Sequence, residues 1–266
     1  MTVKVVTWNV NGIRAREDEF LRLLDEEKPD VAMLQETKAT AEQLPASLYG
    51  LLGLPAYHSI WHGSAGYSGV SVHLRKDVFE RPRDAHPPFD FETRVAEAHA
   101  VKKSGEPFVF VSMYLPNGGK DYQAKLAFMR ALATYPDDLV RRSRADATFA
   151  TENIVVAGDL NVARAEMDVH ETERKPRATG QRPEERKLFE QFLAAGLVDV
   201  CRTLAPEDRE LFTWWPYWNE QRARNVGWRI DYVLATRALA ARAKESRVRR
   251  DFGTSDHAPV VVTFDP

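Results

Sequence analysis

Polar side chains suited to metal binding and proton transfer stand at the ends of several short apolar segments. They comprise carboxylates, amides, one phenol and one imidazole: Asn9, Asn11, Glu36, Tyr114, Asn117, Asp159, Asn161, Asp231, Asp256 and His257. Each alone has an ordinary structural explanation, since Asn and Asp cap helices and form turns. Functional groups gather on loops that a rigid scaffold holds, so side chains from six segments can converge on one pocket.

The chemistry open to such a set is narrow. Oxygen ligands without cysteine favour magnesium or manganese over zinc. A carboxylate beside such a metal can act as a general base toward water, while a histidine and amides stabilise charge on a phosphoryl oxygen. The set therefore predicts metal-assisted hydrolysis of a phosphodiester. The sequence has no Gly-x4-Gly-Lys-Ser/Thr loop and no Gly-x-Ser-x-Gly elbow, which disfavours P-loop and serine-hydrolase chemistry.

The elements that must position these residues follow from the apolar pattern. Strand-like segments occupy residues 3–10, 31–35, 70–74, 108–115, 154–157, 230–235 and 260–264. Several are apolar at consecutive positions, which is typical of strands covered on both faces. Amphipathic stretches predict helices at residues 16–28, 121–134 and 183–195, and a less regular stretch predicts a fourth at 236–245. The alternation predicts an α/β fold with helices covering the sheets.

Length and composition limit the other possibilities. The chain has 266 residues without a repeat or a flexible linker, so we expect a single domain spanning residues 1–266. Its one cysteine, Cys201, excludes an intrachain disulfide and a cysteine-based metal centre. No apolar run approaches the ~18 residues of a membrane span, and polar residues interrupt the N-terminal segment where a signal peptide would be apolar. We therefore expect a cytoplasmic globular protein without membrane contact.

Charge is balanced in total but segregated along the chain. The 37 Lys and Arg residues nearly match the 39 Asp and Glu residues, which excludes a histone-like polycation. Six basic and two acidic residues at 174–187 give a net charge of +4, and nine basic and two acidic residues at 222–250 give +7. Basic segments near the aromatic stretch 212–218 fit phosphate contacts along DNA, although a solvated surface explains them equally. The run of arginines at 141–144 is expected to be a solvated loop.

Seven short motifs occur in order along the chain. They are WNVNGIR at 8–14, LQETK at 34–38, GYSGV at 66–70, YLPNG at 114–118, GDLN at 158–161, GWRIDY at 227–232 and SDHAPV at 255–260. Together they resemble the exonuclease III-type AP endonucleases of the endonuclease/exonuclease/phosphatase superfamily, over essentially the whole chain. GDLN and SDH mark the superfamily alone, whereas LQETK, GYSG and WRID point to the AP-endonuclease branch.

The resemblance implies a fold and an activity. The fold is a four-layered α/β sandwich in which two packed mixed β-sheets are flanked by helices. The activity is that of a DNA-repair nuclease that uses Mg²⁺ or Mn²⁺ and hydrolyses the phosphodiester 5′ to abasic sites. A 3′→5′ exonuclease activity and the cleaning of 3′ ends are implied as well. The partner is double-stranded DNA with abasic sites or 3′ ends, and the protein is expected to be a monomer.

The resemblance also implies roles for individual residues. Metal binding, with Glu36 as the principal ligand, falls to Asn9, Asn11, Glu36, Asp159, Asn161 and Asp256. Catalysis falls to Tyr114, Asp159, Asn161, Asp231 and His257, with Asp231 holding His257 protonated. Substrate binding falls to Asn117, Arg177, Arg182, Trp214, Trp228 and His257, of which the two tryptophans are candidates for the wall of an abasic-sugar pocket.

The sequence leaves the number of metal ions open and allows two alternative functions. Asn11 stands where some relatives carry Asp, which leaves the number of metal ions undecided. A phosphodiesterase or phosphatase of the same superfamily, acting on inositol phosphates, lipids or RNA, is the alternative function. A catalytically silent DNA-binding module is a third hypothesis, which the filled catalytic positions disfavour.

Overall fold

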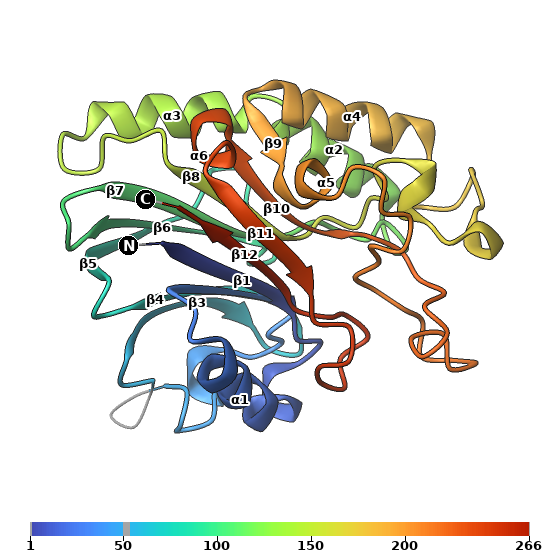
Figure 1. The fold of residues 1–266 in the computed structure, drawn as a ribbon, viewed down its shortest axis with the longest axis horizontal. Helices are drawn as coiled ribbons and strands as arrows, with labels where there is room; N and C mark the ends of the chain where they lie inside the picture. Colours follow the sequence, from blue (N-terminus) through green and yellow to red (C-terminus); the bar gives the residue numbers. More distant parts are fainter. Residues whose placement is uncertain (1, 50–53, 266) are drawn as a thin grey trace.

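The structure, a computed structural model, describes residues 2–49 and 54–265. Two six-stranded sheets form its centre (Figure 1). The first has the order β11 (Ala243–Val248), β12 (Val260–Phe264), β1 (Val3–Asn9), β2 (Val31–Gln35), β4 (Tyr67–Arg75) and β3 (Tyr57–Ser64). The second has the order β5 (Phe79–Ala85), β6 (Val95–Lys102), β7 (Pro107–Tyr114), β8 (Ile154–Asp159), β10 (Asp231–Thr236) and β9 (Leu197–Asp199). Both are mixed, since β1 pairs with β2 and β7 with β8 in parallel.

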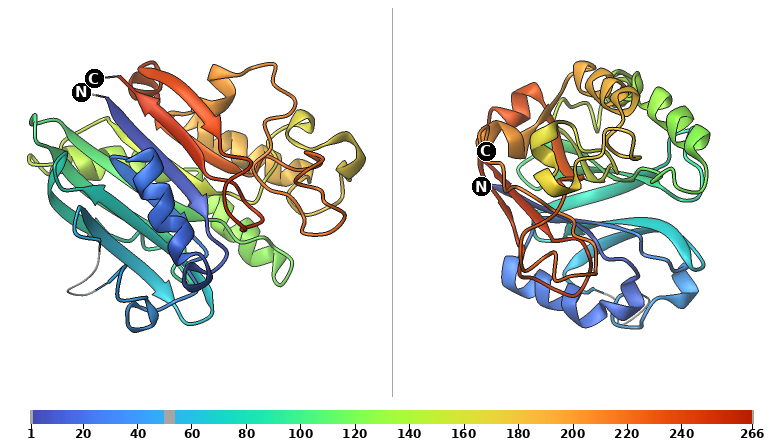
Figure 2. Two further views of the ribbon diagram at one scale, coloured as in Figure 1. Left: turned by 60° about the horizontal axis from the view of Figure 1, so that its bottom comes forward. Right: turned by 90° about the vertical axis from the view of Figure 1, so that its right-hand side faces the viewer.

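Helices cover the outer face of each sheet (Figure 2). Helix α1 (Glu17–Glu27) packs on the first sheet, where Phe20 and Leu23 meet Trp8 in a buried cluster. The second sheet is covered by α2 (Tyr122–Leu132), α3 (Tyr135–Ala145) and α4 (Pro183–Ala194), while α5 (Val200–Leu204) and α6 (Arg237–Ala240) are short. The result is the four-layered α/β sandwich that the sequence predicts.

Strand β1 shows why the apolar runs lack strict alternation. Val3 and Val5 face the core between the two sheets, whereas Val6 and Trp8 face α1 on the other side. Because successive side chains of a strand point to opposite faces, a strand covered on both faces carries apolar residues at consecutive positions. The seven predicted strands are all present, with ends shifted by a few residues at most.

Two predictions of local structure are wrong. The helix expected at 236–245 is only the single turn of α6, and the chain then forms β11, which pairs with β12 as an edge strand. The tertiary pairing overrides a weak helical pattern there. The arginines at 141–144 lie within α3 and not in a loop, and Arg142 contacts Glu97 of the sheet beneath at 2.8 Å. This ion pair depends on a buried carboxylate in another element, so the sequence of the helix alone does not predict it.

Candidate active site

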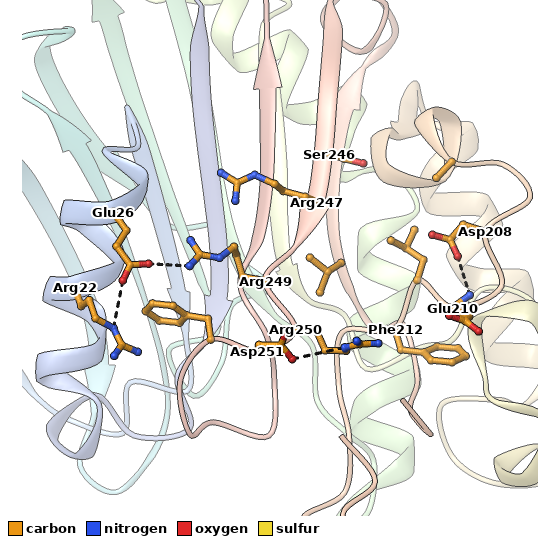
Figure 3. Close-up of a pocket in the computed structure, with 14 residues that line it drawn as sticks. Arg22, Glu26, Asp208, Glu210, Phe212, Ser246, Arg247, Arg249, Arg250 and Asp251 are labelled. Atoms are coloured by element: carbon orange, nitrogen blue, oxygen red, sulfur yellow. Dashed lines mark hydrogen bonds and ion pairs between the residues drawn. The ribbon is translucent and has the colours of Figure 1, made fainter. Parts of the chain in front are cut away.

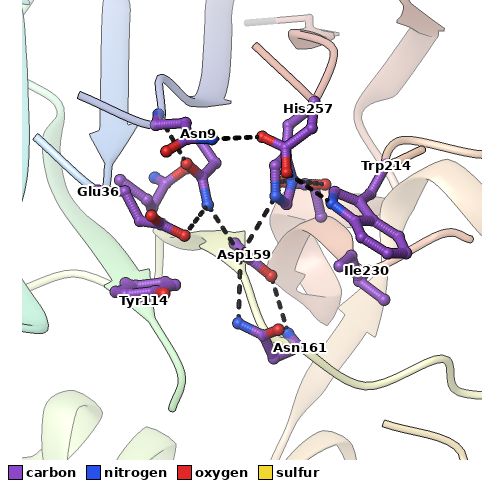
Figure 4. Close-up of polar contacts among 12 residues, drawn as sticks. Asn9, Glu36, Tyr114, Asp159, Asn161, Trp214, Ile230 and His257 are labelled. Atoms are coloured by element: carbon purple, nitrogen blue, oxygen red, sulfur yellow. Dashed lines mark hydrogen bonds and ion pairs between the residues drawn. The ribbon is translucent and has the colours of Figure 1, made fainter. Parts of the chain in front are cut away.

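Strand register brings the predicted residues to one edge of the two sheets. In the second sheet, Tyr114 of β7 pairs with Asp159 of β8, and Asp159 pairs with Asp231 of β10. In the first sheet, Asn9 ends β1 and Glu36 directly follows the neighbouring strand β2. Because the two sheets pack face to face, both groups meet at the same end of the sandwich (Figure 4).

Local backbone conformation directs these side chains into the cavity. Glu36 has a φ of 51°, a left-handed conformation that is uncommon for this residue type. Its carbonyl accepts a 2.7 Å hydrogen bond from the backbone N–H of Gly12, which ties the two loops together. Gly158, just before Asp159, lies against the carbonyl of Met113, where a Cβ atom would come within 1.9 Å of the oxygen. The GDLN motif therefore needs glycine for the close approach of β8 to β7.

Asn9 and Asn161 hold the carboxylates in place. The Asn9 amide nitrogen donates to Glu36 Oε1 at 3.0 Å and to Asp159 Oδ2 at 2.9 Å. Asn161 donates from its backbone N–H to Asp159 Oδ1 at 2.9 Å and from its amide to Asp159 Oδ2 at 3.2 Å. The Asn9 oxygen accepts from the backbone N–H of Asn11, so the nitrogen of Asn9 faces the carboxylates (Figure 4). Asp159 is thus a buried carboxylate with a fully specified orientation.

His257 and Asp231 form a buried pair beside Asp159. The Nδ1 atom of His257 lies 2.9 Å from Asp231 Oδ2, and its Nε2 atom lies 3.7 Å from Asp159 Oδ2. The backbone N–H of Asp231 donates to the Thr213 hydroxyl, which anchors the start of β10. Since Nδ1 is engaged by a carboxylate, Nε2 is the ring nitrogen that points toward Asp159 and the cavity.

Burial and neighbouring charges shift the pKa values of His257 and Asp159. Burial opposes a charge on His257, but the neighbouring carboxylates of Asp231 and Asp159 outweigh it and raise its pKa to about 10. Burial, together with the charges of Asp231 and Glu36, raises the pKa of Asp159 to about 7 although His257 opposes this. A carboxylate whose pKa lies near neutrality is suited to general acid–base work, and a cationic imidazole to binding a phosphate oxygen.

The site can hold a divalent metal ion. Burial would raise the pKa of Glu36, but hydrogen bonds from Asn9 and Lys38 outweigh it, so the pKa is lowered and the group is anionic. The Lys38 ammonium lies 2.8 Å from Glu36 Oε2 and 2.6 Å from the Asn11 oxygen, which shows that these oxygens attract a cation. Asp256 lies next to them, accepting from the Asn11 amide at 2.9 Å. An all-oxygen donor set of this kind fits Mg²⁺ or Mn²⁺.

An aromatic wall closes one side of the cavity, whose volume is about 310 Å³. Trp214 and Trp228 meet edge to face with ring centroids 5.6 Å apart, and Ile230 packs beside them. The Trp214 indole N–H donates to Asp256 Oδ2 at 3.0 Å, so the wall is joined to the acidic side. Trp228 Nε1 is buried without a hydrogen-bond partner in the part of the chain that the structure describes. Asn117 and Thr179 also line the cavity.

Comparison with known proteins identifies the family. Residues 6–257 match the Endonuclease/Exonuclease/phosphatase family. The chain belongs to this family. The chain is 32% identical to the DNA repair nuclease APEX1 of Danio rerio over 264 residues, covering 98% of the chain and 81% of that protein. It is 30% identical to an exodeoxyribonuclease of Bacillus subtilis over 265 residues, covering 97% of the chain and 98% of that protein.

Further comparisons agree with this assignment to the endonuclease/exonuclease/phosphatase family. An AP endonuclease from Archaeoglobus fulgidus superposes with a TM-score of 0.81 at 29% identity, covering 99% of the chain and 100% of that structure. Recombination repair protein 1 of Drosophila melanogaster is 30% identical over 269 residues. The match covers 99% of this chain but only 37% of that longer protein. The resemblance to exonuclease III-type AP endonucleases is confirmed. Enzymes of the family depend on divalent metal ions.

The structure places most of the predicted site residues in or beside this cavity and two outside it. Glu36, Tyr114, Asn117, Asp159, Asn161, Trp214, Trp228, Asp256 and His257 line the cavity directly. Three further predicted residues do not line the cavity but form hydrogen bonds with residues that do: Asn9, Asn11 and Asp231. Arg177 and Arg182 lie on the adjoining loop, where the Arg182 guanidinium stacks over the Tyr122 ring at 4.1 Å. Their positions suit contact with a long substrate and not with the reacting phosphate.

The +7 segment at 222–250 does not form the basic surface that its charge suggests. Arg229 is fully buried between Asp168 and Asp199, at 2.7 and 2.8 Å. Arg247 and Arg249 both pair with Glu27 of α1. Arg242 and Lys244 also form ion pairs, and Arg222 donates to backbone carbonyls. Sequence counts cannot distinguish charges that pair inside the fold from charges that face a ligand.

Sequence reasoning missed several residues at the site. Tyr217 donates to Asp256, and its hydroxyl also accepts from the Asn11 amide at 3.2 Å. Arg94 lies over the Tyr114 ring at 4.8 Å, and burial with the nearby Glu36 and Asp159 charges raises the pKa of Tyr114 well above its usual value. Lys38 sits inside the LQETK motif and Tyr217 inside the aromatic stretch, so both were within reach of the sequence. Arg94 follows no comparable motif.

A larger cleft lies elsewhere and contains none of the predicted site residues. It has a volume of about 730 Å³ and runs between α1, β11 and the segment around Phe212 (Figure 3). Its side chains pair with one another, as where Glu26 bridges Arg22 and Arg249. Size alone therefore does not locate the active site.

Over the described ranges, no helix has the length and apolar character needed to cross a bilayer.

Proposed function

We propose that this protein is a metal-dependent DNA-repair nuclease that hydrolyses the phosphodiester 5′ to abasic sites in duplex DNA. We further propose that it removes nucleotides or blocking groups from 3′ ends. The observation that carries the proposal is that the aromatic wall lies directly beside the residues proposed to bind the metal ion and the phosphate. Trp214, which shares the wall with Trp228, hydrogen-bonds Asp256 at 3.0 Å and lies with its ring 6.4 Å from that of His257.

The wall supports the choice of an abasic nucleotide as substrate. A sugar without a base is extruded from the duplex at low cost, because its pairing and stacking are already lost. Trp214 and Trp228 line the same cavity as His257, so a bare sugar would find an apolar surface beside the group that binds the phosphate. Names of similar proteins, an AP endonuclease and an exodeoxyribonuclease among them, agree with both proposed activities.

The residues of the chain divide the chemical work. Asp159 accepts a proton from the attacking water at its carboxylate, and the bond from phosphorus to O3′ breaks as the new P–O bond forms. His257, protonated and held through Nδ1 by Asp231, donates from Nε2 to a non-bridging phosphate oxygen. Asn161 fixes the orientation of Asp159 through two hydrogen bonds. The O3′ atom leaves as an alkoxide that takes a proton from solvent and becomes a hydroxyl, Asp159 returns its proton to solvent, and the abasic sugar keeps the 5′-phosphate.

Glu36, Asp256 and Asn11 are the residues that we propose to hold Mg²⁺ or Mn²⁺, with Asn9 orienting Glu36. A bound divalent ion supplies Lewis-acid stabilisation of the negative charge on the phosphate. The protein is proposed to act as a monomer of one catalytic domain, in the cytoplasm, where a chain with a single buried cysteine remains reduced.

The test is a comparison of four duplexes that differ only at one position: intact, abasic, recessed 3′-hydroxyl and 3′-phosphate. With Mg²⁺ or Mn²⁺, we expect incision at the abasic site, and release of phosphate or nucleotides from the 3′ ends. EDTA and Asp159→Asn should abolish both. Turnover of an inositol phosphate, lipid or RNA with none of the DNA substrates would show the alternative function, and DNA binding without turnover would show a silent binding module.

A further inference from the structure

A second group of potential metal ligands lies outside the active site. Among the described residues, two groups of three His, Cys, Asp or Glu side chains converge, and one of them is the catalytic group. The other consists of His62, on the edge strand β3 of the first sheet, with His86 and Asp90 in the loop that follows the edge strand β5 of the second. The group therefore spans the two sheets at their common edge.

The three side chains are already close enough to share one ion. His62 Nε2 lies 2.6 Å from Asp90 Oδ2, and the rings of His62 and His86 stack with centroids 3.9 Å apart. One ligand atom of each residue lies within 4.8 Å of the others. Asp84 adds an exposed carboxylate oxygen 3.9 Å from His86 Nε2, so a fourth donor is within reach.

Hydrogen bonds to the backbone determine which atoms of His86 and Asp90 are available to an ion. His86 Nδ1 lies 3.2 Å from the carbonyl oxygen of Val95, and because a carbonyl only accepts, Nδ1 carries the proton and Nε2 keeps its lone pair. Asp90 Oδ1 accepts from the backbone N–H groups of Arg94 and Val95 at 2.8 and 2.9 Å, which leaves Oδ2 for a ligand. Orientation of a ligating histidine and carboxylate by such outer contacts is a regular feature of metal sites.

The geometry points to a zinc-type transition-metal site formed by His62, His86 and Asp90. Two imidazole nitrogens and one carboxylate oxygen suit Zn²⁺ and similar ions, whereas Mg²⁺ and Mn²⁺ prefer oxygen donors. The fourth position is filled by Asp84 or water. Its chemistry therefore differs from that of the oxygen-rich catalytic site.

Such an ion joins the two sheets near the active site. Asp90 holds the backbone of Arg94, and the Arg94 guanidinium lies over the Tyr114 ring at 4.8 Å. A metal on Asp90 therefore fixes the loop whose Arg94 packs on Tyr114, a residue that lines the catalytic cavity. Since an ion that binds only the folded state stabilises it, zinc should raise the melting temperature through this site.

The test uses Zn²⁺ alone, titrated by calorimetry into the full chain after removal of metals with a chelator. The comparison is between His86→Asn, which removes an exposed ligand, and His58→Asn, which removes another imidazole of the same strand as His62. We expect the wild-type protein and His58→Asn to bind one more equivalent of Zn²⁺ than His86→Asn. The zinc-dependent rise in melting temperature should be smaller in His86→Asn, and Mg²⁺ titrations should be the same in all three proteins.

Equal zinc stoichiometry and affinity in wild-type protein and His86→Asn would overturn the proposal and leave His62 and Asp90 as a plain ion pair. Should His86→Asn fail to fold, as judged by circular dichroism, His62→Asn makes the same comparison at the other imidazole. Neither variant alters a residue of the catalytic cavity, so a missing zinc site and a missing nuclease activity are separate results.

Discussion

The carboxylate of Asp231 holds Nδ1 of His257 at 2.9 Å, and both groups are buried beside Asp159. The pair joins the first residue of β10 in one sheet to the loop before β12 in the other. A buried imidazole with this partner stays cationic, because the adjacent negative charge stabilises its protonated form. The proposed hydrogen bond from Nε2 to the phosphate depends on this pairing.

Asp231→Asn is therefore expected to slow turnover while the fold persists. Loss of the carboxylate charge weakens the cationic form of His257, and we expect kcat to fall by about 10- to 100-fold, less than removal of a direct donor. Single-turnover rates on an abasic duplex measure this. Asp25→Asn on the exposed face of α1 is the matched control, and an Asp231→Asn rate equal to that control would contradict the role of the pair.

Removal of the main anionic ligand should change the metal dependence. Glu36→Ala deletes a carboxylate that is anionic in the structure, so we expect a half-maximal Mg²⁺ concentration at least ~10-fold higher, together with lower maximal activity. Titration of activity with Mg²⁺ and with Mn²⁺ measures both effects. The exposed Glu207→Ala variant should titrate like wild-type protein. An unchanged Mg²⁺ titration in Glu36→Ala would show that the ion is held elsewhere.

The two basic segments should respond differently to substitution. Arg177 is exposed on the loop beside the cavity, so Arg177→Ala should reduce the slope of log affinity for DNA against log salt by about 1. Arg229 is buried between Asp168 and Asp199, and Arg229→Met removes the buried cation that both carboxylates share, at a cost of about 3–5 kcal/mol in unfolding free energy.

Urea unfolding and the salt dependence of DNA binding separate these two effects. Arg229→Met should leave the salt slope unchanged, provided that the measurement is made where the variant is folded. A stable Arg229→Met protein with a reduced salt slope would mean that Arg229 faces DNA, and the interpretation of the +7 segment would have to be reversed.

Acid should destabilise the fold through His73. This residue is buried between the hydroxyls of Ser59 and Ser71, and burial lowers its pKa to about 3. The unfolded chain binds a proton at His73 below pH ~6.5, whereas the folded chain does not until the pH nears 3. Unfolding therefore takes up a proton in this window, and stability falls by about 1.4 kcal/mol for each pH unit as the pH decreases.

Unfolding free energies of wild-type protein and His73→Gln between pH 7 and pH 4 isolate this contribution from that of the carboxylates. The glutamine variant should show a shallower decline, because it has no proton to take up at that position. Parallel curves for the two proteins would contradict the assignment of a neutral buried histidine.

The candidate catalytic groups were accessible from sequence because several of them lie at the end of a strand that is easily recognised. Asp159 and Asn161 come directly after an apolar run, and the chain-order motifs around them are those of a known family. Edge strands such as β3 and β5 were missed, since they are polar on their exposed side and break the apolar pattern. Lys38 and Tyr217 stand in segments that the sequence singles out, but their contacts, like those of Arg94, depend on how distant loops pack, which spacing along the chain does not encode.

The same reason explains the second metal group. His62 lies on a strand of the first sheet and Asp90, 28 positions away, in a loop of the second, so only the packing of β3 against the loop after β5 brings them together. Net charge was misleading in a related way. Arg229 and Arg247 contribute to a basic stretch in the sequence but neutralise Asp168 and Glu27 in the fold.

The most direct test of the central claim is the identity of the ends produced from a duplex with a single abasic site in the presence of Mg²⁺. The geometry around Asp159 and His257 predicts hydrolysis 5′ to the site, which leaves a 3′-hydroxyl that a DNA polymerase extends and a sugar that keeps its 5′-phosphate. The Asp159→Asn variant should produce neither. Cleavage on the 3′ side that leaves an unsaturated sugar, or no cleavage with either metal, would contradict the account.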